Sequence, residues 1–105
     1  MEIQFTTQVF KEGNAFVAHT PELDISSCGG TEIEALKNLK EAVSLFVEET
    51  AKMGTLNRIL EEAGFFKHDD TLEGPQLIST QRISLPLPLL NAGQAKGLLN
   101  NNMYD

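Results

Sequence analysis

Residues 31–54, TEIEALKNLKEAVSLFVEETAKMG, decide the fold of this 105-residue chain. Thr31 and Glu34 form a capping box, in which the Thr31 hydroxyl accepts from the N–H of residue 34 and the Glu34 carboxylate from the N–H of Thr31. Gly54 stands where a helix ends. Between them, large apolar residues recur at steps of three and four: Ile33, Leu36, Leu39, Val43, Phe46 and Val47. This spacing predicts an amphipathic helix of about 22 residues that dominates the core.

Strands are predicted ahead of this helix. Residues 2–10 and 15–20 alternate between apolar and polar side chains, and the Gly13-Asn14 turn between them indicates an antiparallel hairpin. Pro21 ends the second strand, because proline has no N–H for the ladder. Residues 25–28 then predict a short third strand before Gly29-Gly30.

A second, shorter helix is predicted from Thr55 to Gly64, with residues 67–75 as a polar linker. Residues 76–89 predict a last strand, which Pro86 and Pro88 restrict to a sheet edge. The order is then β-β-β-α-α-β, with the helices on one face of a small antiparallel sheet. This order defines an α+β fold.

One domain is expected over residues 1–90. Its core lies in residues 2–66, and residues 91–105 form a loosely ordered tail because they are rich in Asn and Gly.

Composition excludes several classes of protein. Eight Lys and Arg oppose fifteen Asp and Glu, so the net charge is −7 and argues against direct binding to nucleic acid. Cys28 is the single cysteine, which excludes a disulfide scaffold. The sequence has no apolar run of about 18 residues and no basic-then-apolar leader in residues 1–15. A cytoplasmic protein is therefore expected.

The helical string Thr31-x-x-Glu34-Ala35-x-x-Asn38-x-x-Glu41-Ala42, with Ala18-His19-Thr20-Pro21-Glu22-Leu23 ahead of it, resembles the HicB-like antitoxin family. The resemblance implies a β-β-β-α-β sheet similar to a degraded ribonuclease H fold. It also implies a protein that binds and neutralises HicA, a small basic RNA-cleaving toxin.

Many members of that family add a C-terminal module that binds DNA. Here Pro88, Gly93 and Gly97 interrupt any long helix after residue 85, and only two basic residues follow position 75. Direct DNA binding by this chain is therefore not expected.

The predicted partner-binding residues lie along the exposed side of the long helix: Glu34, Asn38, Glu41, Glu48 and Glu49. The carboxylates of the four glutamates could replace RNA phosphates and steer a basic toxin, whose RNA-binding cleft the domain then covers. The alternative interpretation is a solvated helix face, with a Glu48–Lys52 pair adding a few tenths of a kcal/mol.

No catalytic, cofactor or metal site is predicted. A ribonuclease H-type nuclease needs convergent carboxylates around two metal ions, and the strand interiors carry none. His19 and Cys28 supply at most two zinc ligands. A non-enzymatic antitoxin is therefore expected. Two alternatives stay open: a solitary oligomeric module without a toxin, and a metal-dependent nuclease that uses Glu22 and Asp24.

Self-association is expected through the C-terminal strand. Its apolar residues, Ile83, Leu85, Leu87 and Leu89, alternate with prolines and a serine. Apolar residues in a terminal strand suggest burial against the helices or a second subunit, so a homodimer or higher oligomer is predicted.

Overall fold

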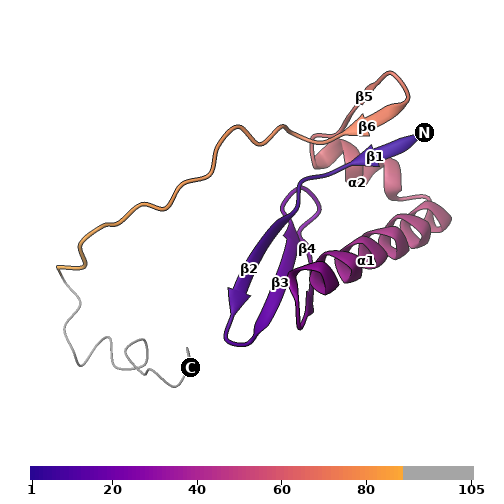
Figure 1. Cartoon of the computed structure of the whole chain (residues 1–105). Helices are drawn as coiled ribbons and strands as arrows, with labels where there is room; N and C mark the ends of the chain where they lie inside the picture. Colours follow the sequence, from indigo (N-terminus) through magenta and orange to yellow (C-terminus); the bar gives the residue numbers. More distant parts are fainter. Residues whose placement is uncertain (89–105) are drawn as a thin grey trace.

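A computed structural model describes residues 1–88 of the chain and confirms the α+β class (Figure 1). The elements in these residues are β1 (Glu2–Gln4), β2 (Gln8–Glu12), β3 (Ala15–Thr20), β4 (Ile25–Gly29), α1 (Glu32–Met53), α2 (Leu56–Glu62), β5 (Phe66–His68) and β6 (Thr71–Glu73). They form two three-stranded sheets and two helices, and the longer helix packs on one sheet.

The larger sheet is antiparallel, with the order β2-β3-β4. Strand residues alternate between the two faces, so Phe16, Ala18 and Thr20 of β3 face α1, whereas Val17 and His19 face away. The core lies between this sheet and α1. Its fully buried centre consists of Ala18, Ala35, Leu39 and Val43.

The smaller sheet has the order β1-β6-β5. β1 lies parallel to β6, with Ile3 opposite Leu72, and both helices belong to the long connection that parallel pairing requires. β5 and β6 form a hairpin, and Asp69 in its turn takes a left-handed φ of 55°. Asp tolerates this conformation better than most residues.

The predicted first strand over residues 2–10 is divided into two, and its halves belong to different sheets. The interruption covers residues 5–7, where the Thr6 N–H donates to Glu22 Oε2 at 2.8 Å instead of to a neighbouring strand. The Glu22 side chain, from the β3–β4 connection, therefore binds the backbone at the point where the β1 ladder ends and before the β2 ladder begins.

The region after α2 also differs from prediction. A strand over residues 76–89 is wrong for residues 76–88, which contain neither helix nor strand. The supposed linker over residues 67–75 contains β6 and most of β5 instead. Its polar run forms a hairpin turn, and β6 ends at Gly74-Pro75 because proline cannot donate to the ladder. Leu89 and the predicted tail over residues 91–105 lie outside the described residues.

α1 begins and ends as predicted. Thr31 is extended and accepts from the Glu34 N–H at 3.1 Å, and Gly54 follows the helix with a φ of 77°. The Glu34 carboxylate accepts from the Gly30 N–H at 3.3 Å and not from that of Thr31. Ile33, which was predicted to be in the core, is 81% exposed. It lies about 200° around the helix from the buried Ala35.

Replacing Thr31 with alanine should lower the free energy of unfolding by about 0.5 to 2 kcal/mol, because the Glu34 N–H loses its acceptor. Urea denaturation followed by circular dichroism measures the change. Thr31→Ser is the control, since it keeps the hydroxyl and should stay close to the parent. Equal loss in the two variants would show that the methyl group, and not the cap, is responsible.

Candidate functional site

The exposed side of α1 carries a line of carboxylates at Glu34, Glu41 and Glu48, here called the acidic stripe. Seven residues are close to two helical turns, so these three side chains lie one above the other. Leu45 lies in the same line and is 58% exposed. The predicted Glu49 is also exposed, but it lies about 100° away from Glu48 on the flank of the stripe.

Among residues 1–88, no lysine or arginine lies within ion-pair distance of these three carboxylates, although Lys37 and Lys52 lie on the same side of α1. The ion pairs among residues 1–88 join histidines or the N-terminal amine to carboxylates outside α1. The predicted Glu48–Lys52 pair is not among them. The carboxylates of the stripe are therefore exposed to solvent without a close ion-pair partner among the described residues.

Two of the predicted partner-binding residues already have structural partners. Asn38 Nδ2 donates to the carbonyl oxygen of Cys28 at 2.8 Å, and the Glu34 carboxylate accepts from the Gly30 N–H. Both bonds join α1 to the end of β4 and the loop that follows. Glu41 and Glu48 are therefore the stronger candidates for partner contact, since neither has such a bond in the structure.

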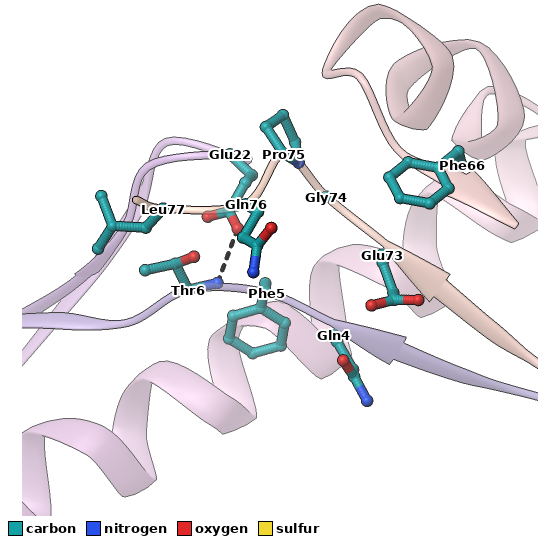
Figure 2. A pocket seen from close by; sticks show the side chains of 10 residues that line it. All are labelled: Gln4, Phe5, Thr6, Glu22, Phe66, Glu73, Gly74, Pro75, Gln76 and Leu77. Atoms are coloured by element: carbon teal, nitrogen blue, oxygen red, sulfur yellow. Dashed lines mark hydrogen bonds between the residues drawn. The ribbon is translucent and has the colours of Figure 1, made fainter. Parts of the chain in front are cut away.

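A hollow of about 420 Å³ lies where the two sheets meet (Figure 2). Residues 74–77 cross over Phe5 and Thr6 on one side of it, and Glu22 points toward the Thr6 backbone. The other oxygen of Glu22 accepts from the Thr20 hydroxyl at 3.2 Å. Glu22 thus ties the connection between β1 and β2 to the end of β3, a role that sequence reasoning missed because no local spacing connects position 22 with position 6.

The remaining titratable groups make pairs at the surface. His19 Nε2 lies 3.0 Å from Asp24 Oδ1, and His68 Nδ1 lies 2.7 Å from Glu73 Oε2. Among residues 1–88, no three His, Cys, Asp or Glu side chains gather as metal ligands. Glu22 and Asp24, which the nuclease alternative requires, have different partners and do not form a shared site.

The predicted oligomer residues that the structure describes are exposed. Ile83, Leu85 and Leu87 expose 79%, 80% and 68% of their surfaces, on a segment that runs away from both sheets (Figure 1). The helices of the same chain do not cover them, so the expectation of burial within one chain is not met. Burial against a second subunit stays a prediction.

Comparison with protein-family models, with curated proteins and with solved structures gives no match for this chain. Among residues 1–88, no helix is both long enough and apolar enough to cross a membrane. The described part of the molecule has three notable features: an α+β body, an acidic stripe on its long helix and an exposed apolar segment after β6.

Proposed function

We propose that this protein is a non-catalytic, HicB-like antitoxin that binds a small basic RNA-cleaving toxin of the HicA type and covers its RNA-binding cleft. The observation that carries the proposal is the acidic stripe, whose carboxylates are exposed and have no lysine or arginine partner in the described residues. The family resemblance of the α1 sequence supports it independently.

Electrostatics favours a basic protein as the partner. A net charge of −7 repels nucleic acid and attracts a surface built to bind RNA phosphate. The stripe lies on a helix whose inner side is packed against β3 and β4, so its carboxylates are held by a rigid support. Charges placed in this way increase the association rate and select the partner more than they increase affinity.

Leu45 gives the stripe an apolar contact at its centre. An exposed leucine between Glu41 and Glu48 is suited to a small hollow in a basic surface, where desolvation contributes affinity that screened charges do not. Contact of this kind is enough to cover the RNA-binding cleft of the toxin, because the proposed inhibition makes and breaks no covalent bond. A cytoplasmic location belongs to the same proposal, because the RNA that such a toxin cleaves is there.

A second candidate is a solitary oligomeric module without a toxin. The observation that favours it is the exposure of Ile83, Leu85 and Leu87, because contiguous exposed apolar residues mark interaction sites. The two candidates differ in whether a basic partner exists. The nuclease alternative has no comparable support, since its carboxylates have separate structural partners.

If the reading frame next to this one encodes a small basic protein, co-expression of the two should give a complex that purifies as a unit. Glu41→Lys should weaken that complex about tenfold at 50 mM salt, because it reverses a charge at the centre of the stripe. The loss should shrink at 500 mM salt, where screening acts over only a few ångströms. Titration calorimetry at the two salt concentrations measures both values.

Glu12→Lys is the matched control, because it makes the same change in net charge on an exposed residue of β2. It should leave the affinity within about twofold of the parent value. Equal weakening of the complex by the two substitutions would show that net charge, and not the position of the acidic stripe, determines binding. Absence of any complex with the neighbouring basic protein would favour the solitary module.

A further inference from the structure

The outer face of the small sheet forms one wall of the hollow of about 420 Å³. Paired residues of neighbouring strands have their side chains on the same face, and the register places Glu73 between Gln4 and Phe66. These three residues line the hollow, whereas Ile3 lines two other hollows beside α1, on the opposite face. A carboxamide, a carboxylate and an aromatic ring therefore lie in one row across β1, β6 and β5 (Figure 2).

Glu22 supplies a second carboxylate to the same hollow. Its two oxygens accept one bond each, from the Thr6 N–H at 2.8 Å and from the Thr20 hydroxyl at 3.2 Å. Both donors are neutral, and among residues 1–88 no cationic side chain lies within ion-pair distance of Glu22. Because a carboxylate oxygen has two lone pairs, each oxygen can accept a further bond. Glu22 is therefore held in place while its charge stays unpaired in the described chain.

Glu73 also keeps an acceptor for a ligand. Its Oε2 lies 2.7 Å from His68 Nδ1, and its side chain is 30% exposed. No hydrogen bond of Glu73 Oε1 is found in residues 1–88. Phe66, directly opposite on β5, is 56% exposed, so a partly open aromatic ring lies beside this carboxylate.

This combination of groups favours a guanidinium as the ligand. The described residues that line the hollow include two glutamates and neither lysine nor arginine, and the net charge of −7 adds long-range attraction for a cation. A guanidinium donates two parallel N–H bonds to a carboxylate and stacks flat on an aromatic ring, and Glu73 and Phe66 offer both contacts side by side. An ammonium group is a point charge and cannot make this paired contact.

The backbone around the hollow favours a peptide as the carrier of the guanidinium. Residues 5–7 and 74–77 are in neither helix nor strand. No backbone–backbone hydrogen bond of Gln76 or Leu77 is found in the part of the chain that the structure describes. Their N–H and C=O groups are therefore free to bind the main chain of an extended peptide, as an unpaired sheet edge does.

We propose that the hollow binds an arginine side chain of an extended peptide. The guanidinium bonds to Glu73 and stacks on Phe66, Glu22 contributes a second negative charge, and the main chain of the peptide lies along residues 76–77. This inference does not rest on the proposed toxin binding, because no residue of α1 lines the hollow. It gives the protein a second interaction surface, separate from the acidic stripe.

Titration of the full chain with two short peptides tests the proposal, and two-dimensional NMR follows the binding. Acetyl-Gly-Arg-Gly-amide and acetyl-Gly-Lys-Gly-amide carry the same charge. The arginine peptide should bind at least about fivefold more tightly, because only its side chain can make the paired bond and stack. It should shift the amide signals of Thr6, Glu73 and Gln76. Ethylguanidinium, which has the same cationic group but no main chain, should bind more weakly than the arginine peptide.

Substitutions in the hollow identify the groups that bind. Glu73→Gln should raise the dissociation constant of the arginine peptide about tenfold, because it removes the charge but keeps the size of the side chain. Phe66→Leu should raise it about threefold, because the ring is lost and an apolar side chain remains. Glu62→Gln is the matched control, since Glu62 is an exposed residue at the end of α2 and outside the hollow. Circular dichroism verifies the fold of each variant.

Four outcomes contradict an arginine site in this hollow. Equal binding of the arginine and lysine peptides would show that charge alone attracts them. An affinity that both Glu73→Gln and Phe66→Leu leave unchanged, or signal shifts confined to the acidic stripe of α1, would place the peptide elsewhere. Ethylguanidinium that binds as tightly as the arginine peptide would overturn the assignment of a peptide.

Discussion

Replacing Leu39 with alanine should lower the free energy of unfolding by about 2 to 5 kcal/mol. Leu39 has no exposed surface and lies at the centre of the core, where α1 meets Ala18 of β3 and is flanked by Ala35 and Val43. The alanine leaves a cavity, because the close-packed backbones of the sheet and the helix cannot collapse into it. The loss is a large part of the total stability expected for a domain of this size.

Leu45→Ala is the matched control for this prediction, since it makes the same chemical change in the same helix. Leu45 is exposed, so its replacement should change the stability by no more than about 0.5 kcal/mol. Urea titration followed by circular dichroism at 222 nm gives both values. Similar losses at positions 39 and 45 would contradict the packing of α1 on the sheet.

Gly29→Ala should lower the free energy of unfolding by about 1 to 3 kcal/mol. A Cβ at position 29 would lie 2.7 Å from the backbone nitrogen of Ala35 and 2.9 Å from the Glu34 Cβ. These atoms belong to the first turn of α1 and cannot move without displacing the helix from β4. The glycine is therefore required by close approach and not by a positive φ.

Gly30→Ala separates this effect from the general cost of replacing a glycine. A Cβ at position 30 meets no atom within 4 Å, so the substitution should be almost neutral. Hydrogen exchange adds a local measure, because Gly29→Ala should reduce the protection of amides in the first turns of α1. Equal stability of the two variants would show that the helix start does not lie against the end of β4.

Both substitutions bear on function as well as on stability. Leu39 and Gly29 hold α1 against the sheet, and α1 carries the acidic stripe on its outer side. If a basic partner recognises a fixed spacing of Glu41 and Glu48, loosening the helix should weaken binding although neither residue touches the partner. The Leu39 and Gly29 variants thus test whether the packing of α1 on the sheet holds the acidic stripe in the arrangement that a partner would bind.

Much of the secondary structure could be predicted from the amino-acid sequence because it depends on interactions between residues close together in the chain. The start of α1 depends on Thr31 and Glu34, three residues apart, and its end on Gly54. The strands over residues 15–20 and 25–28 follow from alternation and from Pro21 between them. The acidic stripe was also predictable, since residues seven apart on a helix share a side whatever surrounds them.

The sequence by itself therefore specified the α+β class, the long helix with its caps and the side on which its carboxylates lie. The division of the first strand depended instead on a bond between Thr6 and Glu22, and the β1–β6 ladder on Ile3 meeting Leu72. Such contacts join residues far apart in the chain, and their energy depends on how whole elements pack. No local pattern encodes that packing, which is why the hairpin of β5 and β6 and the exposed segment over residues 76–88 were found only in the tertiary structure.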